Sequence, residues 1–353
     1  GAGVRIAVMD VGFKGLTDAY RNGDIPYGAR TYDFTGKGIE TEYYHGTACA
    51  EIIYDIVPDA ELYLLKISDE IDIYNAIDFC IENKIDIISM SIGTFGTGPG
   101  DGTGPLDEYF DMARDNGILV VASAGNFANM EMDYDADGNV DFIFGGHWEG
   151  NFYDSDNDGI HEFTGSHPAI TYNLIGAYPS QDDDGNPDTS EVSILLRWDD
   201  WIDRKMIDYD LYLYEYDLIN DSIGDLAGYS NITQDGSQPP MEYISIDLAD
   251  DEDTQYYALV VQKKTGEPAG TEIEIYLGGT STFLPFRWSI SAIATSKSSI
   301  NEPADAESVL AVGAIYYGNW EYGPQESYSS QGPTNAWAGS TARIKPDISG
   351  PDG

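Results

Sequence analysis

Four short, mainly apolar segments in the first third of the chain constrain its fold more than any other feature. They are residues 5–9, 62–67, 85–90 and 118–122. Such runs are typical of strands that are buried on both faces, and strands of this kind occur in parallel sheets covered by helices. We therefore expect an α/β domain with a parallel sheet and helices on both faces.

Segments with helical features lie between these strands. Apolar side chains recur at helical spacing over residues 71–83. Residues 45–54 stop before Pro58, and residues 106–116 stop at Gly117, as a C-terminal glycine would end a helix. The alternation of strands and helices over residues 1–126 supports the α/β assignment.

The character of the chain changes after residue 126. Asp, Gly and Asn dominate residues 129–160, and segments with period-two alternation follow at 191–198, 209–216, 241–247, 256–262, 272–277 and 286–292. Short alternating segments with turn-rich links predict an antiparallel β-sandwich. Because a buried strand returns at residues 308–314, we expect an inserted domain over 127–297 between two parts of the α/β domain, 1–126 and an incomplete 298–353.

The charge of the chain excludes several functions. Its 353 residues carry 62 acids and 17 bases, a net charge of −45. Nucleic acids need Lys and Arg partners for their phosphates, so we expect no nucleic-acid partner, and anionic membrane surfaces are equally unfavourable. No apolar run reaches the ~18 residues of a membrane span. Calcium binding, a surface adapted to high salt and attraction of basic substrates remain as explanations of the acid excess.

The two cysteines, Cys49 and Cys80, are too few for a disulfide scaffold. Both fall on apolar faces of predicted helices, which favours two buried small side chains. A single disulfide between them stays open.

Three polar residues stand where they could catalyse acyl transfer. Asp10 ends an apolar strand, His45 opens a helix and Asn126 closes another strand. Imidazole is the side chain whose pKa suits proton transfer near neutral pH, and a carboxylate can orient it and stabilise its charged form. An amide donor can stabilise the oxyanion of the intermediate. Each residue alone has a structural explanation, as a turn, a cap or a core residue, but their order and separation argue for chemistry.

With their flanking residues, these positions resemble the subtilisin-like serine protease (subtilase) family. The likeness is carried by His45-Gly46-Thr47-Ala48, by Ser123-Ala124-Gly125-Asn126 and by the Ser329–Pro333 and Arg343–Asp347 segments. The resemblance implies that Asp10 is the acid, His45 the base and Asn126 the oxyanion donor. It implies an endopeptidase with polypeptide substrates.

The resemblance also indicates where substrate would bind. It places Ser91, Ile92 and Gly93 on one wall of the pocket for the residue before the scissile bond, and Ser123, Ala124 and Gly125 on the other. Small residues on both walls predict a roomy apolar pocket and broad specificity.

The family's Gly-Thr-Ser nucleophile segment does not occur in this sequence. Gly339-Ser340-Thr341 has the wrong order and precedes the Lys345-Pro346 landmark, so we reject Ser340 as the nucleophile. Loss of the serine lowers turnover by roughly 10⁶. We therefore expect this chain by itself to be inactive, with the missing serine a short distance past Gly353. A shortened chain, a nicked chain and a serine-less pseudoprotease all stay open as explanations.

Two loops of the predicted insertion have carboxylates at alternate positions around a glycine. The candidate ligands are Asp133, Asp135, Asp137, Asn139 and Asp141 in the first loop, and Asp154, Asp156, Asp158, Ile160 and Glu162 in the second. This spacing suits Ca²⁺, with the backbone carbonyl of residue 139 or 160 as one ligand. The glutamate of an EF-hand is absent at position 12, so these are not EF-hands. Solvated Asp/Gly turns are the structural alternative.

Residues 191–279 resemble the bacterial pre-peptidase C-terminal type of β-sandwich, whose role here is open. Together these features predict an extracellular, secreted or cell-surface, calcium-stabilised serine endopeptidase. The alternative is a non-catalytic calcium-binding interaction or adhesion protein on a subtilase frame. The oligomeric state is not predicted.

Overall fold

The computed structural model divides the chain into two compact units. The first comprises Gly1–Gly125, Ile300–Pro324 and Ile344–Gly353, and the second Asn126–Ser299 and Gln325–Arg343. The residues described are 1–41, 43–133, 139–165, 169–178, 191–203, 206–248, 254–266, 271–285, 289 and 291–352.

A parallel sheet forms the centre of the first unit. Its strands are β1 (Arg5–Asp10), β2 (Arg30–Asp33), β3 (Glu61–Lys66), β4 (Ile87–Met90), β5 (Leu119–Ser123), β17 (Val309–Tyr316) and β18 (Ile348–Asp352). Within the described ranges they form one seven-stranded sheet in the order β18-β17-β5-β4-β1-β3-β2. All its neighbours pair in parallel, so the carboxyl ends of β1, β3, β4 and β5 meet at one edge.

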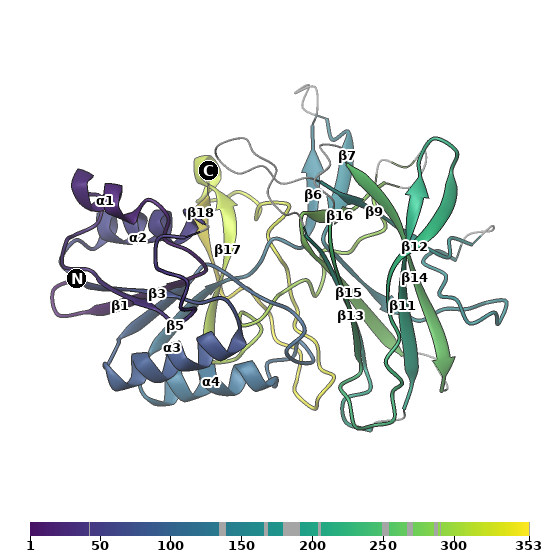
Figure 1. The fold of residues 1–353 in the computed structure, drawn as a ribbon, viewed down its shortest axis with the longest axis horizontal. Helices are drawn as coiled ribbons and strands as arrows, with labels where there is room; N and C mark the ends of the chain where they lie inside the picture. The colour runs from purple at the N-terminus through teal and green to yellow at the C-terminus, as the bar shows by residue number, and fades with distance from the viewer. Residues whose placement is uncertain are drawn as a thin grey trace. The chain divides into compact units, whose positions relative to one another are not determined.

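Helices cover both faces of this sheet. They are α1 (Leu16–Asn22), α2 (His45–Ile56), α3 (Glu70–Glu82) and α4 (Pro105–Asp115), and a 3₁₀ turn, η1, spans Tyr317–Asn319. Figure 1 shows α1 and α2 on one face and α3 and α4 on the other. The start of α3 is fixed by Asp69, whose carboxylate accepts the N–H of Asp72, as expected of an N-cap. No helix among the described residues is long and apolar enough to cross a membrane.

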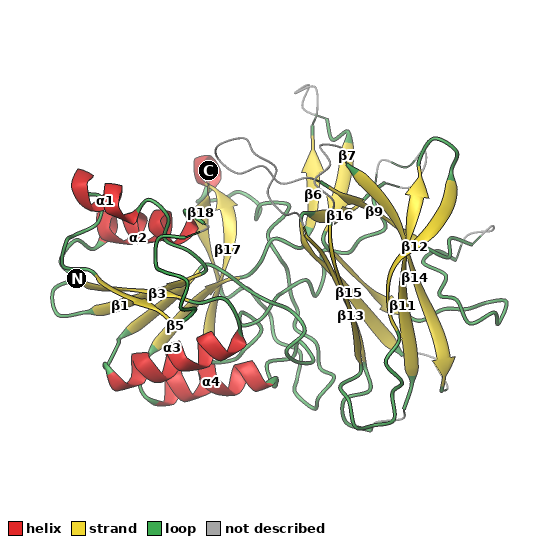
Figure 2. Cartoon of the chain, in the orientation of Figure 1, coloured by secondary structure: helices red, strands yellow, loops and turns green. Residues whose placement is uncertain are grey.

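The second unit consists of antiparallel strands (Figure 2). They are β6 (Asn129–Met132), β7 (Phe142–Gly145), β8 (His147–Asn151), β9 (Asn173–Ala177), β10 (Glu191–Trp198), β11 (Asp208–Asp217), β12 (Ser222–Ser230), β13 (Met241–Asp247), β14 (Gln255–Thr265), β15 (Glu272–Gly279) and β16 (Ser281–Phe283). The described strands make a four-stranded sheet, β13-β10-β15-β8, and a seven-stranded sheet, β12-β11-β14-β9-β16-β7-β6.

The inner faces of these two sheets form one core. Leu211 and Leu213 of β11 are fully buried and pack with Trp198 of β10, whereas Tyr212 between them is only partly buried. This alternation is what a sandwich strand with one buried face requires. The expected fold class, a parallel α/β sheet interrupted by an antiparallel sandwich, is thus confirmed.

Some predicted segments differ from the structure. Strands were expected at residues 286–292, but 286–288 and 290 lie outside the described residues, and 291 and 292 form only isolated bridges. The sequence pattern missed β2, β6–β9, β12, β16 and β18, several of which have only three to five residues. Such short strands have too few alternations to show a period.

Residues 325–343 were expected to continue the α/β domain, but the structure places them in the second unit. Two contacts give the reason. The Asn335 side-chain amide donates to the Glu274 carboxylate at 2.8 Å, and the Trp337 indole N–H donates to Glu272 at 3.1 Å. The chain therefore returns to β15 of the sandwich before it enters β18.

Glu274 is the centre of a buried charge network in the second unit. It accepts from the Arg197 guanidinium at 2.6 Å and from His147 Nε2 at 2.9 Å. Glu274 and His147 have no exposed surface, and Arg197 is only 2% exposed. Burial alone would raise the pKa of Glu274, but Arg197 and His147 outweigh it and hold the pKa at about 2.

We predict that Glu274→Gln lowers the free energy of unfolding of the second unit by about 3–5 kcal/mol, because it leaves Arg197 buried without its counter-charge. Because the pKa of Glu274 is lower in the folded than in the unfolded state, its carboxylate stabilises the fold at pH values above the unfolded pKa. This stabilisation is lost as the pH falls towards 2. Urea unfolding at pH 7 and at pH 3 measures both effects. Glu131→Gln, an exposed position on β6, is the control. An equal, small effect of both variants would contradict the prediction.

Candidate active site

Asp10 and His45, far apart in the sequence, are in direct contact. Asp10 is the last residue of β1 and His45 the first of α2. The His45 Nδ1–H group donates to Asp10 Oδ2 at 2.7 Å, and the N–H of Val11 donates to Asp10 Oδ1 at 2.8 Å. Asp10 has no exposed surface, whereas the His45 side chain is 49% exposed. The carboxylate is thus held in place on the buried side of a ring that is open to solvent.

A glycine allows α2 to approach β1 this closely. A Cβ at Gly46 would lie 2.5 Å from the Gly12 carbonyl oxygen and 2.8 Å from Asp10 Cβ. The Gly46 N–H also donates to that carbonyl oxygen at 3.0 Å. Any larger residue at position 46 would push the helix, and His45 with it, away from Asp10.

The contact with Asp10 changes the charge of His45. The hydrogen bond to Asp10, followed by the contact with Cys49, raises the pKa of His45 to about 10 despite partial burial. Asp10 therefore stabilises the imidazolium form, which is the form a histidine adopts after it accepts a proton. Because the pKa of His45 is higher in the folded than in the unfolded state, protonated His45 stabilises the fold. This stabilisation is complete below pH about 6.5 and is lost as the pH rises through about 10.

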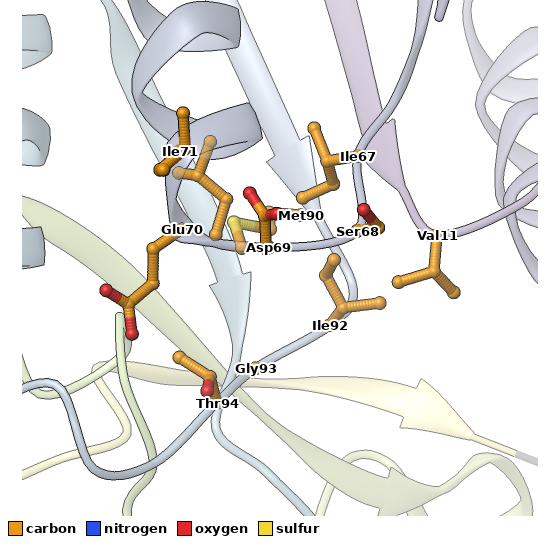
Figure 3. Close-up of a pocket in the computed structure, with 11 residues that line it drawn as sticks. Val11, Ile67, Ser68, Asp69, Glu70, Ile71, Met90, Ile92, Gly93 and Thr94 are labelled. Atoms are coloured by element: carbon orange, nitrogen blue, oxygen red, sulfur yellow. The ribbon is translucent and has the colours of Figure 1, made fainter. Parts of the chain in front are cut away.

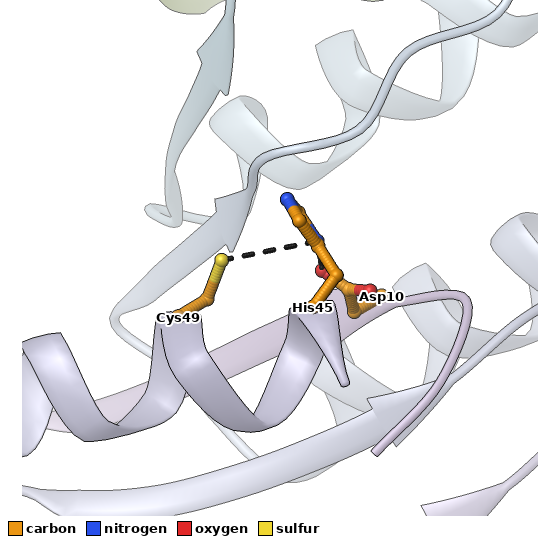
Figure 4. Close-up of side chains that lie close together, drawn as sticks. All are labelled: Asp10, His45 and Cys49. Atoms are coloured by element: carbon orange, nitrogen blue, oxygen red, sulfur yellow. Dashed lines mark hydrogen bonds and ion pairs between the residues drawn. The ribbon is translucent and has the colours of Figure 1, made fainter. Parts of the chain in front are cut away.

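A thiol lies next to the pair (Figure 4). Cys49 stands one turn after His45 on α2, and its Sγ lies 3.9 Å from His45 Nδ1. Both cysteines are free, so no disulfide joins them. Cys80 is fully buried, which raises the pKa of its thiol to about 12, as expected for a core side chain. Cys49 is only partly buried, unlike Cys80. Its contact with His45 was not predicted, although residues four apart on a helix lie on the same face.

The expected substrate-binding residues lie at the carboxyl ends of neighbouring strands. Ser91, Ile92 and Gly93 follow β4, and Ser123, Ala124 and Gly125 end or follow β5, which pairs with β4. Asn126 is exposed and is the first residue of the second unit.

A residue from a distant part of the sequence fills the space directly beside the Gly93 Cα. A Cβ at Gly93 would lie 1.7 Å from the side-chain nitrogen of Asn301, and the Asn301 N–H faces the Ala124 carbonyl oxygen at 3.4 Å. Asn301 is far from both walls in the sequence, so only the tertiary structure could reveal it.

A pocket of about 640 Å³ is lined in part by Ile92, Gly93 and Thr94 (Figure 3). Its apolar lining comes from the residues that directly follow β1 and β3, from the end of β4 and the residues after it, and from the start of α3. Its acidic residues are Asp69 and Glu70. In Figure 3, Val11, which directly follows Asp10, and Glu70 lie at opposite ends of the lining. The pocket therefore reaches from the Asp10 strand to an acidic rim.

The second predicted calcium loop is partly assembled. One carboxylate oxygen each from Asp154, Asp156 and Glu162 lie within 4.8 Å of one another. Asp158 is not in this group, and its carboxylate accepts the N–H of Ile160 at 2.8 Å. Three hard oxygen donors fit a cation such as Ca²⁺. In the first loop, Asp135 and Asp137 lie outside the described residues, so Asp133, Asn139 and Asp141 cannot be placed around them.

Comparison with known proteins supports the protease resemblance. Residues 1–147 match the model of the subtilase family, Peptidase_S8. The major intracellular serine protease of Bacillus subtilis is 33% identical over 144 residues, which are 36% of this chain and 44% of that protein. Subtilisin E of the same species is 30% identical over 141 residues, 36% of this chain and 35% of that protein. The matched part of the chain is thus similar to subtilisin-like proteases, and it spans less than half the length of either relative.

One solved structure resembles nearly the whole chain. The Clostridium perfringens CspB protease superimposes with a TM-score of 0.52 at 13% identity, over 99% of this chain and 76% of that one. At this identity the likeness concerns the fold alone. It extends over both the parallel sheet and the antiparallel strands.

We predict that Asp10→Asn returns the pKa of His45 from about 10 to about 6.5 or below, because an amide cannot stabilise the imidazolium. An NMR titration of the histidine ring protons measures this shift. His161, whose pKa burial lowers to about 4, serves as an internal reference that should not move. A His45 that titrates identically in both proteins would show that the contact with Asp10 does not govern its charge.

Proposed function

We propose that this chain belongs to a subtilisin-like serine endopeptidase. The observation that carries the proposal is the 2.7 Å hydrogen bond between buried Asp10 and solvent-accessible His45. In this proposal Asp10 and His45 are two members of an Asp-His-Ser triad. No serine of the sequence stands in the Gly-Thr-Ser context, so we propose that the chain alone does not hydrolyse peptides.

The proposed chemistry follows from the ring geometry. Because Nδ1 donates to Asp10, Nε2 is the nitrogen left to take the proton from a serine hydroxyl and return it to the leaving amine. The stabilised imidazolium is the product of the first of these steps. With a pKa of His45 near 10, the neutral base is scarce at pH 7, so the rate should rise well into the alkaline range. Asn126 would supply an amide donor to the oxyanion.

The proposed substrate is an extended polypeptide that lies along Ser91–Gly93. Asn301 narrows the site on one side of Gly93, which argues against a wide, unselective pocket there. The 640 Å³ pocket that Gly93 also lines offers Ile67, Ile92 and neighbouring apolar side chains. A large apolar side chain of the substrate suits this lining.

A serine-directed fluorophosphonate probe tests the proposed activity. We expect the 353-residue chain to remain unlabelled. A chain that also carries a Gly-Thr-Ser segment, below called the complete protein, should be labelled and should hydrolyse peptides. His45→Ala in the complete protein should reduce turnover by about 10⁴–10⁶, whereas the neighbouring Cys49→Ala should retain most of it. A complete protein that neither reacts nor hydrolyses would sink the proposal and favour the non-catalytic interaction or adhesion protein.

Calcium is the second part of the proposal, at the Asp154–Asp156–Glu162 loop. Glu162 is only 7% exposed, and its carboxylate accepts from the Ser155 N–H at 2.8 Å, which aligns it with the loop. Asn157 and Gly159 have positive φ, which turns the loop back on itself. Ca²⁺ there would offset two of the three negative charges of these carboxylates in a strongly acidic chain. The secreted or cell-surface location that we propose would supply this ion.

We predict that saturating Ca²⁺ raises the melting temperature of the chain by about 5–10 °C over a chelator, since 100-fold excess over Kd stabilises by about 2.7 kcal/mol. The double variant Asp154→Asn, Glu162→Gln should lose this response. Asp225→Asn, an exposed position on β12, should keep it. Unchanged melting of the parent chain would remove calcium from the proposal.

A further inference from the structure

A fully buried lysine lies beside the Asp10–His45 pair. Lys66 ends β3 and has no exposed surface. Parallel pairing places it opposite Asp10 of β1 on one side and opposite Asp33 of β2 on the other. Side chains at paired positions of a sheet point to the same face, so carboxylate, ammonium and carboxylate follow one another across its carboxyl edge. A fully buried lysine almost always has polar partners, so the partners of Lys66 need to be identified.

The ammonium of Lys66 binds the loop that leads to His45. Lys66 Nζ donates to the Gly38 carbonyl oxygen at 3.0 Å and to Thr41 Oγ1. On the other side of the same glycine, the Gly38 N–H donates to Asp33 Oδ2 at 2.7 Å. The ammonium of Lys66 thus holds the carbonyl group of Gly38, and the carboxylate of Asp33 holds its N–H group.

This loop is also clamped to the segment that follows Asp10. The Phe13 N–H donates to the Ile39 carbonyl oxygen at 3.2 Å, and the Lys14 N–H donates to the Tyr43 carbonyl oxygen at 2.9 Å. His45 begins α2 two residues after Tyr43. The geometry of the loop therefore decides where His45 stands relative to the end of β1.

We propose that Lys66 is a positioning residue for the Asp10–His45 pair. Its ammonium fixes residues 38–41 of the loop and thereby the distance and orientation of His45 towards Asp10. Because the ammonium is fully buried, its hydrogen bonds to Gly38 and Thr41 hold the loop in one geometry. The consequence for catalysis rests on the proposed protease function, whereas the positioning itself concerns only this chain.

Lys66→Met tests the positioning in the 353-residue chain, because methionine fills similar space without the charge. We expect the His45 Nδ1–H resonance, which reports the hydrogen bond to Asp10, to broaden or disappear. Amide exchange at Lys14 and Gly46 should accelerate at least tenfold. The matched control is Lys345→Met, which removes a second buried lysine of the same unit, bound to the Val309 carbonyl oxygen and Asp347. It should leave the His45 resonance and both amides unchanged.

Thr41→Val is the milder variant, since it removes one acceptor of Lys66 and leaves the sheet intact. It should shift the same resonance and amides by a smaller amount, and it decides the matter where Lys66→Met does not fold. Unaltered His45 and Gly46 signals in the folded Lys66 variant or in Thr41→Val would overturn the proposal, as would equal effects of Lys345→Met.

Kinetics of the complete protein separate this proposal from the protease proposal. Lys66→Met should lower kcat by about 10² with little change in KM, because a small displacement of a catalytic group costs rate rather than binding. A complete protein without any activity would refute the protease function and leave the NMR result on positioning intact. A full kcat in folded Lys66→Met would refute the positioning even in an active protease.

Discussion

The close approach of α2 to the carboxyl end of β1 is the constraint on which the candidate site depends. Gly46 allows it, since a Cβ there would meet the Gly12 carbonyl oxygen and Asp10 Cβ. The approach brings His45 to the buried carboxylate of Asp10 and makes the imidazolium its stable form. The exposed side of the ring remains free to exchange protons. Burial of one partner and exposure of the other is what a proton-transfer pair needs.

Several buried basic side chains have oxygen partners inside the fold. The chain has 17 bases against 62 acids, yet in its described part Lys66, Lys345 and Arg197 are almost fully buried. Each has oxygen partners: Gly38 for Lys66, Asp347 for Lys345, and Glu274 for Arg197. Unpaired charges are costly in a low-dielectric interior, so these few bases hold segments that are distant in the sequence. Lys66 does so for the loop before His45. Glu274, the partner of Arg197, binds Asn335 and so holds residues 325–343.

Much of the fold could be read from local patterns. The strands at residues 191–198 and 241–247 agree with β10 and β13 at both ends, and the helices at 71–83 and 106–116 agree with α3 and α4 to within one residue. Long elements with one buried face have a clear period. The strand β2 was missed, because its four residues are mostly exposed. Residues 325–343 were misplaced because their contacts with β15 involve residues about sixty positions away.

The sequence by itself determined the α/β class, the antiparallel sandwich and the candidacy of Asp10 and His45, because apolar periodicity and motif order are local properties. Only the tertiary structure decided that His45 contacts Asp10, that Cys49 stands beside them and that Asn301 fills the space at Gly93. The register of β1, β3 and β2 likewise placed Lys66 between two carboxylates. These contacts depend on strand order and on close backbone approaches between distant segments, which no local pattern of residues encodes.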